Sequence, residues 1–265
     1  MTEERKHYTT QLSAGLGLIN ETKILLNLWD SALDSSSLFQ AALNSGEFAT
    51  VSARRLKNIV LECFAPRYLA DDALPATLLK HHQSLFSSNE FNQLLCLYTC
   101  RANAILADFI RQVYWVQYSS GYETLTNDDA KEFVARAVEE GKTKKTWSES
   151  TIKKVSSYLT GCCSDFGFLE KIRKSERKLL PVHLELKVAA ILIHDLHFSG
   201  LGDNAAISHK DWGIFGLEPE DVRSELKRLS LKNYLMIQSA GDVTRIGWKF
   251  KHMEEVLDVI AQGRF

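Results

Sequence analysis

The sequence predicts a mainly α-helical protein whose C-terminal part also carries short β-hairpins. Gly and Pro are few, 14 and 4 of 265 residues, and they separate amphipathic segments instead of interrupting them. Two segments, residues 168–180 and 234–248, instead have the apolar ends and polar turn of a hairpin. We therefore expect a helical N-terminal domain with a helix-turn-helix-like element over residues 1–121. Winged-helix-like units with short hairpin wings should fill residues 122–265.

Three amphipathic helices are expected in the first part of the chain. The first covers about residues 20–29, and the second follows Ser35 and ends before Gly46, a C-terminal cap. The third begins near Thr50 or Ser52 and stops before Pro66, because proline cannot continue a helix.

The third helix has an apolar and a basic side. Its inward residues are Leu56, Ile59, Val60, Cys63 and Phe64. This places Arg54 and Asn58 outward and Arg55 and Lys57 on the flanks. A short turn followed by a helix with early arginines is typical of a helix-turn-helix, and it is equally typical of a plain three-helix bundle.

A long apolar and aromatic stretch, residues 88–118, should form the buried spine of the N-terminal domain. The segment 118–122 then breaks this pattern, which is why we expect the domain boundary near residue 121. A new helix follows, capped by Asn127 or Asp128, running to Glu140 and closed by Gly141.

The start of the next helix is predicted at Trp147-Ser148-Glu149-Ser150-Thr151, because either serine can cap the first turn. Its inner face carries Ile152, Val155 and Leu159. Its outward face carries Ser150, Lys153, Lys154 and Ser157 and is therefore polar and cationic. After Gly161, a small turn through 165–167 leads to the first hairpin.

This hairpin concentrates positive charge near its tip, at Lys171, Arg173, Lys174, Arg177 and Lys178. Residues 142–178 hold ten Lys or Arg and four acidic residues, whereas the whole chain has a net charge of −1. A positive patch on a near-neutral protein is the pattern of a phosphate-binding surface. The expected DNA contacts are Lys144, Lys145, Ser148, Ser150, Thr151, Lys153, Lys154, Ser157, Lys171, Arg173, Lys174, Arg177 and Lys178, with Arg54, Arg55, Lys57 and Asn58 on the N-terminal helix.

The C-terminal part repeats the helix and hairpin theme. We expect a helix over about 182–197, a short helix at 211–212, and a helix with Pro219 in its first turn. Val222, Leu226 and Leu229 line the inner face of that last helix, and the hairpin turns at 240–242. Acidic residues crowd the N-terminal end of the helix that begins near Pro219. We therefore expect this unit to serve packing or assembly more than DNA contact.

Several of these segments together resemble a known family. The matching segments are Trp147-Ser148-Glu149-Ser150-Thr151-Ile152-Lys153-Lys154 with Asp165-Phe166-Gly167-Phe168-Leu169-Glu170, then Asp211-Trp212 and Ser239-Ala240-Gly241. Looser matches lie at 18–24 and 51–56. They resemble the BrxA family, the small A component of bacteriophage-exclusion (BREX) defence systems, over nearly the whole chain.

The resemblance implies a cytoplasmic, non-catalytic accessory protein of a bacterial anti-phage defence system. It implies binding of double-stranded DNA, no cofactor, no membrane attachment and contact with other BREX components. Homo-oligomerisation stays open. The charge pattern favours nucleic acid independently of the resemblance.

Three other interpretations fit parts of the sequence. His194-Asp195, with His197 and with His81-His82 upstream, faintly resembles a metal phosphohydrolase ligand set, although His194 lies on an apolar helix. Adjacent Cys162-Cys163 could suggest redox chemistry, but we expect all five cysteines to be reduced packing residues. The serious rival is a protein assembly module of the same system without direct DNA binding.

The sequence also predicts no secretion or membrane insertion. The charged first six residues are not followed by an apolar segment, so no signal peptide is expected. The longest uninterrupted apolar run, 188–193, is far shorter than the ~18 residues that a membrane span requires.

Overall fold

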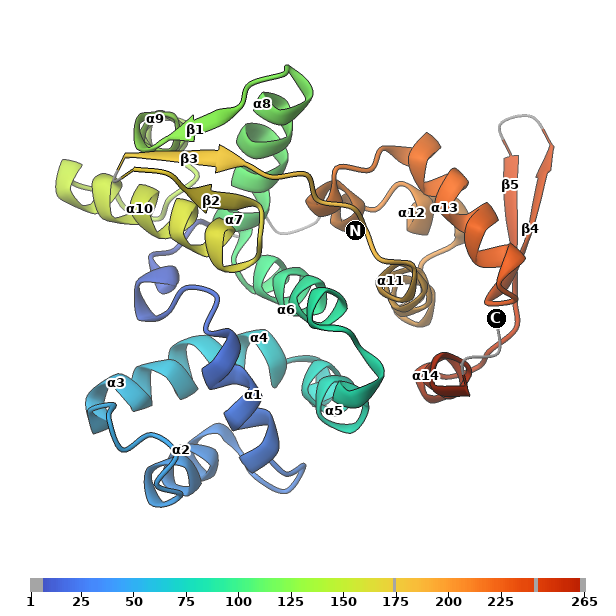
Figure 1. Ribbon diagram of the computed structural model, residues 1–265, viewed down its shortest axis with the longest axis horizontal. Helices are drawn as coiled ribbons and strands as arrows, with labels where there is room; N and C mark the ends of the chain where they lie inside the picture. The colour runs from blue at the N-terminus through green and yellow to red at the C-terminus, as the bar shows by residue number, and fades with distance from the viewer. Residues whose placement is uncertain (1–6, 174, 241–242, 263–265) are drawn as a thin grey trace. The chain divides into compact units, whose positions relative to one another are not determined.

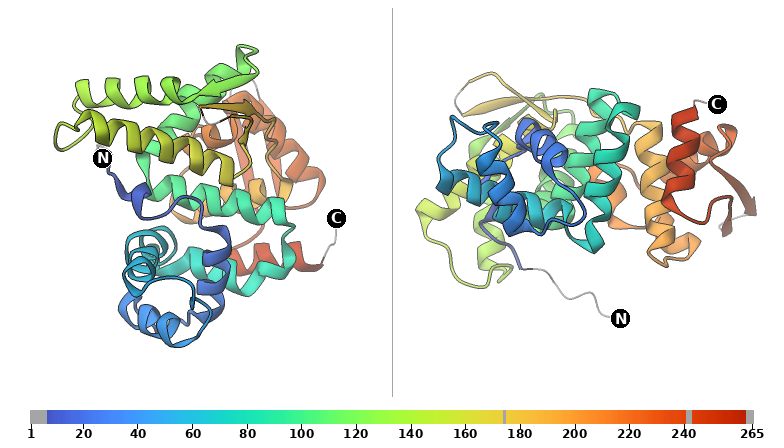
Figure 2. Two further views of the ribbon diagram at one scale, coloured as in Figure 1. Left: turned by 60° about the vertical axis from the view of Figure 1, so that its left-hand side comes forward. Right: turned by 90° about the horizontal axis from the view of Figure 1, so that it is seen from below.

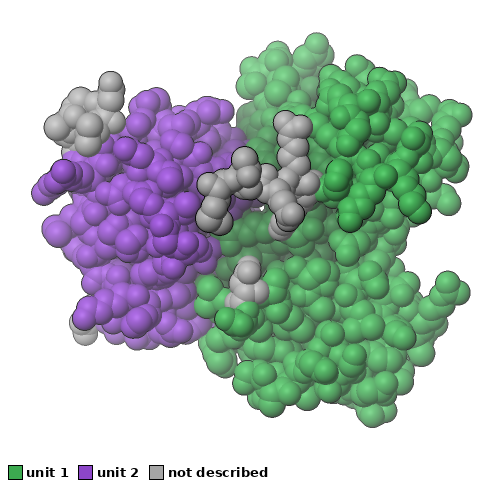
Figure 3. Space-filling view, turned by 180° about the vertical axis from the view of Figure 1, so that it is seen from behind, with its two compact units in different colours: residues 1–81, 95–182 green, residues 82–94, 183–265 purple. Residues whose placement is uncertain are grey.

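The computed structural model describes residues 7–173, 175–240 and 243–262. Over these ranges the protein is mainly helical with two small antiparallel sheets, which confirms the predicted class (Figure 1). Backbone contacts divide the chain into two compact units (Figure 3). Unit 1 contains residues 1–81 and 95–182, and unit 2 contains residues 82–94 and 183–265.

This division differs from the boundary expected near residue 121, which lies within unit 1. The segments on either side of that position pack on each other, since α9 (Asn127–Glu139) contacts η5 (Ile110–Tyr114). Unit 2 instead takes a short piece from the middle of the chain, which no break in composition marks.

Unit 1 begins with short helices. They are η1 (Gln11–Ala14), α1 (Ile19–Leu28), α2 (Ser35–Asn44), α3 (Ala53–Asn58), η2 (Ile59–Phe64), α4 (Ala65–Tyr68), η3 (Asp71–Ala73) and α5 (Leu74–His82). Asp34 caps α2 and Ser52 caps α3 through their side-chain oxygens. The three expected helices are therefore confirmed, and all five predicted inward residues of the third are buried.

The third helix does not stop before Pro66. It continues to Tyr68 through the π-helical stretch η2, in which the Ala65 N–H donates to the Val60 carbonyl. Pro66 follows this stretch directly, and the wider π-helical turn accommodates a residue that has no N–H to donate.

The second part of unit 1 contains the sheet. Its elements are the end of α6 (Ser88–Ala102), α7 (Ala104–Phe109), η5, α8 (Trp115–Ser119), β1 (Thr124–Thr126), α9, α10 (Glu149–Asp165), β2 (Leu169–Lys171) and β3 (Glu176–Leu179). Helices α9 and α10 pack on each other, and the left view of Figure 2 shows them side by side. The strands are ordered β1-β3-β2, all antiparallel.

The predicted apolar spine is confirmed in this unit. Leu95, Ile105, Phe109 and Tyr114 are all buried, and the Tyr114 ring meets Phe168 edge to face at 4.9 Å. This contact joins the spine to the residue that opens the hairpin.

The cap of α9 is Thr126, not Asn127 or Asp128. The Thr126 side chain accepts from the Asp129 N–H while Asp129 accepts from the Thr126 N–H, a reciprocal capping box. Gly141 does close this helix, with φ of 68°.

Unit 2 packs a second set of helices with a hairpin. Besides residues 82–94 it contains α11 (Leu186–Phe198), α12 (Asp203–Ile207), η6 (Lys210–Phe215), α13 (Pro219–Leu231), β4 (Leu235–Ala240), β5 (Val243–Trp248) and α14 (Met253–Gln262). The second predicted hairpin is confirmed as paired strands, although its tip, 241–242, lies outside the described residues.

Helix α11 begins later than expected, at Leu186 instead of near 182. The Gln93 side chain donates to the His183 carbonyl at 2.7 Å and accepts from the Glu185 N–H at 2.9 Å. These bonds take backbone groups that a longer helix would use, so the chain stays extended here.

His194 and His197 belong to the packing of unit 2. The His194 ring is fully buried, and its Nδ1 lies 2.7 Å from the Ala190 carbonyl oxygen. The His197 ring stacks on Trp248, with centroids 3.8 Å apart. Burial lowers the pKa of His194 to about 4.

Among the described residues, none of the helices combines the length and the hydropathy that crossing a membrane would require.

Because the pKa of His194 is lower in the folded protein than in the unfolded chain, acid should destabilise the fold. The stability is fully present above the unfolded pKa of 6.5 and is lost as the pH falls toward 4. Relative to His194→Leu, the wild type should lose about 3 kcal/mol of unfolding free energy between pH 7 and pH 4. Urea unfolding followed by tryptophan fluorescence measures this, and equal pH dependence of both proteins would contradict it.

Candidate nucleic-acid interface

Helix α10 forms as the sequence predicts, and its two faces differ in polarity. Ser148 caps it, accepting from the Thr151 N–H at 3.3 Å. Val155 and Leu159 are buried, whereas the outward residues are exposed, namely Ser150, Lys153, Lys154 and Ser157. The cationic face of α10 therefore points to solvent, as expected.

The helix does not end at Gly161 but continues to Asp165. A Cβ at 161 would lie 2.8 Å from a methyl group of Leu16, so glycine lets Leu16 pack close to the helix, and a larger residue would require the Leu16 side chain to shift. Further along, the Asp165 carboxylate accepts from the Gly17 N–H at 2.9 Å. Burial raises the pKa of Asp165, while the bond from Gly17 opposes that shift. These contacts fix α10 against the segment 15–18, and so fix which face remains exposed.

The hairpin of β2 and β3 follows and packs against α10. Leu169 pairs with Leu179 and Lys171 pairs with Arg177, so these four side chains share one face of the sheet. Leu169 and Leu179 are buried, which identifies this face as the one turned toward the helices. Glu170 pairs with Lys178 on the opposite face.

The predicted cations of the hairpin therefore differ in their surroundings. Lys171 and Arg173 are exposed, at the tip-side end of the hairpin. Arg177 is half-buried and donates to the Ser164 hydroxyl at 3.4 Å, which ties it to α10. Lys178 is exposed but directly opposite an acidic residue. Lys174 lies outside the described residues.

The loop before α10 contributes further charge. Lys144 and Lys145 are exposed, as is Ser148, while Thr151 is half-buried. Lys142, in contrast, forms an ion pair with Glu140 at 2.7 Å. The neighbouring acid Glu149, in the first turn of α10, is paired at 3.3 Å with Lys131 of α9.

The four predicted contacts on the N-terminal helix are not equivalent. Arg54 is exposed, but the Arg55 guanidinium donates to the backbone carbonyl of Ala14. Lys57 is exposed and lines a pocket beside α2, and Asn58 is half-buried.

Helix α13 of unit 2 has a different charge pattern. Glu218 and Asp221 form the capping box at its N-terminus. Arg223 pairs with Glu220 at 2.5 Å and Arg228 pairs with Glu225 at 2.8 Å, each one turn apart. The cations of this helix are thus largely balanced within the helix.

The rival chemical sites are not assembled in the structure. Among the described residues, no three His, Cys, Asp or Glu side chains are grouped so as to hold a metal ion. All five cysteines are buried free thiols, and burial raises the pKa of Cys63, Cys162 and Cys163. A raised pKa disfavours the reactive thiolate.

Sequence reasoning missed two features of this surface. Strand β1 adds a third strand to the hairpin, but three residues are too short for a readable alternation. The bond between Arg177 and Ser164 joins residues 13 apart in sequence and has no local signal.

Comparison with known proteins gives a family but few relatives. A family model described as BrxA matches residues 6–195. No curated protein matches the chain. A solved structure, the crystal structure of an uncharacterized protein from Magnetospirillum magneticum, is similar at 13% identity with a TM-score of 0.47, covering 72% of this chain and 94% of that one. Because the family model spans most of its length, the chain belongs to the BrxA family, whose members are associated with BREX anti-phage defence.

Proposed function

We propose that this protein is a non-catalytic, cytoplasmic accessory protein of BREX defence that binds double-stranded DNA through α10 and the β2–β3 hairpin. The observation that carries the proposal is the placement of exposed cations on two elements that pack on each other. Lys153 and Lys154 extend from α10, and Lys171 and Arg173 extend from the hairpin. The buried residues Val155 and Leu159 of α10 and Leu169 and Leu179 of the hairpin hold the two elements in place.

The chain order of this part of unit 1 supports the proposal. The elements come in the order α8, β1, α9, α10, β2 and β3, and the strands of the sheet are ordered β1-β3-β2. A winged helix has the same order of elements, and in that comparison α10 would be the recognition helix and the β2–β3 hairpin the wing. A helix of this kind enters the major groove while the wing contacts the flanking backbone.

The side chains of α10 favour binding without strong sequence preference. Its exposed face carries serines and lysines, which contact phosphates. Long Asn, Gln or Arg side chains, which read base edges by paired hydrogen bonds, are scarce there.

Other predicted contacts would extend the same surface or form a second one. Lys144 and Lys145 flank the start of α10 and would reach neighbouring phosphates. On the N-terminal helix, Arg54 is the best-placed contact, since it is exposed near a helix N-terminus, where anions are favoured. Arg55 would have to leave the Ala14 carbonyl to take part.

The alternative is an assembly module that binds proteins instead of DNA. Lysine is depleted at protein interfaces, whereas phosphate-binding surfaces require cations. The exposed lysines of α10 and the hairpin therefore favour DNA for this surface. A surface that binds proteins would then lie elsewhere on the molecule.

Affinity for an unrelated duplex should depend steeply on salt. With ~5 phosphates neutralised, the logarithm of the binding constant should fall with log salt at a slope of about −4 to −5. Anisotropy titrations at several salt concentrations measure this slope. A salt-insensitive complex, or no complex at ~50 mM salt, would refute DNA binding.

The two faces of the hairpin provide a matched pair of variants. Lys171→Gln should reduce the salt slope by about 1, because one phosphate contact is lost. Lys178→Gln, which removes the same charge from the opposite face, should leave the slope unchanged.

A stronger change tests which unit binds. Lys171→Glu with Arg173→Glu should lower affinity at least about tenfold at constant stability, since exposed side chains contribute little to folding. The control, Lys227→Glu with Arg228→Glu on α13, reverses as many charges and should have a smaller effect. A larger loss with the α13 variant would assign DNA to unit 2.

A further inference from the structure

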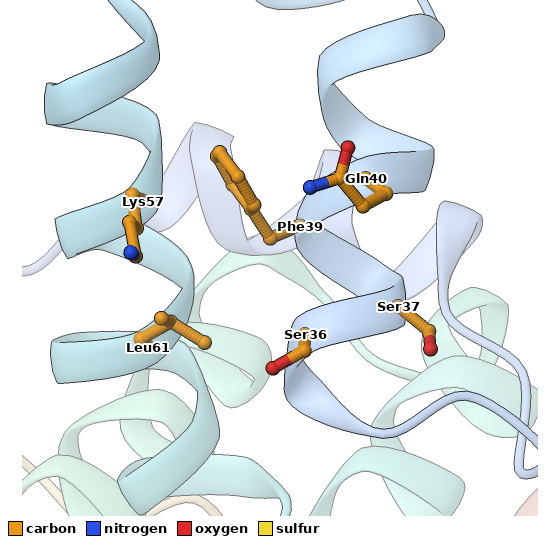
Figure 4. A pocket seen from close by; sticks show the side chains of 6 residues that line it. All are labelled: Ser36, Ser37, Phe39, Gln40, Lys57 and Leu61. Carbon is orange, nitrogen blue, oxygen red and sulfur yellow. The ribbon is translucent and has the colours of Figure 1, made fainter.

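A surface pocket of about 290 Å³ lies within unit 1, between α2 and the helix formed by α3 and η2 (Figure 4). It is lined by Ser36, Ser37, Phe39, Gln40, Lys57 and Leu61. Phe39 extends from α2 toward the opposite helix, which carries Lys57 and Leu61 (Figure 4). None of these side chains belongs to the surface of α10 and the hairpin.

The floor of the pocket is apolar and partly uncovered. Phe39 and Leu61 are half-buried. Leu43, one turn beyond Phe39 on α2, is 44% exposed and continues the same apolar stripe. Apolar side chains left open along a groove between two helices are typical of a site that receives a side chain of a partner.

The backbone beneath Leu61 has an unusual form. Leu61 belongs to the π-helical stretch η2, in which one extra residue is accommodated in the turn. Such turns are rare and occur frequently at functional sites, because they move side chains out of their regular positions. Here the stretch leaves Leu61 at the pocket while its neighbours Val60 and Cys63 remain in the core.

The charge of the pocket is one-sided. Lys57 is the one charged residue among the side chains that line it in the described structure. The nearest acid along α2, Asp34, caps that helix by accepting from the Ser37 N–H at 2.7 Å. Lys57 lies at the same end as Phe39, whereas Ser36 and Leu61 lie at the other (Figure 4). A carboxylate beside Lys57 would therefore complement the pocket.

We propose that this pocket is a docking site for a protein partner within the defence system, and that it receives an apolar side chain flanked by an acidic residue. The volume is at the small end for a pocket that holds a whole small molecule, ~300 Å³ upward, but suits one or two side chains of a docked segment. The partner's carboxylate would pair with Lys57 at the rim. The site is independent of DNA binding by α10 and the hairpin.

Site-specific photocrosslinking of the full chain tests this docking site. p-Benzoyl-phenylalanine replaces Gln40, which is exposed at the pocket, in cells that co-express the other components of the system. Replacement of Gln112, an exposed glutamine of η5, is the matched control. We expect Gln40 to give a crosslink that Gln112 does not. The crosslinked partner segment, mapped by mass spectrometry, should contain an apolar residue within a few positions of Asp or Glu.

Two variants then test the chemistry. Lys57→Glu and Leu61→Asp should each reduce the crosslink at least fivefold. A synthetic peptide of the mapped segment should bind at least fivefold more weakly when its acidic residues are changed to Gln. Leu61 is not among the predicted DNA contacts, so Leu61→Asp should bind a ~10 base-pair duplex as the wild type does, which separates this docking site from the DNA surface. Circular dichroism should show both variants to be as helical as the wild type.

Several outcomes would overturn the proposal. They are no crosslink above the Gln112 control, a crosslink to a second copy of this chain or to DNA, and a mapped segment without the acidic and apolar pair. Full retention of the crosslink by both variants would also overturn it.

Discussion

The arrangement of unit 1 depends on a buried arginine that holds a short segment of backbone. Arg67 is 3% exposed, and its guanidinium donates to the carbonyls of Gly15 and Leu16, both at 2.8 Å. This fixes the segment 15–18, against which α10 is seated through Gly161 and Asp165. A hydrogen bond from a charged group typically contributes ~1.5–3 kcal/mol, so these two bonds restrict the movement of the segment.

The seating of α10 determines what the protein presents to a ligand. One face of the helix packs on α9 and on the N-terminal segment, and the exposed residues in its first three turns after Glu149 are the serines and lysines at 150, 153, 154 and 157. The hairpin is fixed in turn, because its buried leucines must face the helices. Strand alternation then assigns Lys171 to one side and Lys178 to the other. The exposed lysines and serines of α10 are of the kind that contact phosphates, which agrees with the proposed DNA surface.

Much of this could be predicted from the sequence, and the exceptions have physical causes. The caps, amphipathic periods and both hairpins follow from local chemistry, as Ser148 and the run 168–180 illustrate. Gly161 lies inside α10 and allows close packing against Leu16, a residue 145 positions earlier in the chain, and no local pattern indicates this contact. Pro66 was interpreted as a stop, but a π-helical turn accommodates it. The charge of the candidate surface was predictable, whereas the bonds that engage Arg55 and Arg177 are long-range and were not.

The central claim is that DNA binds to α10 and the hairpin of unit 1, and amide hydrogen exchange of the full chain with and without a duplex tests it most directly. The account predicts slower exchange in residues 149–157 and 171–173 on adding DNA, with exchange in α13 unchanged. Protection confined to α13, or no protection anywhere under conditions in which the duplex is bound, would contradict it.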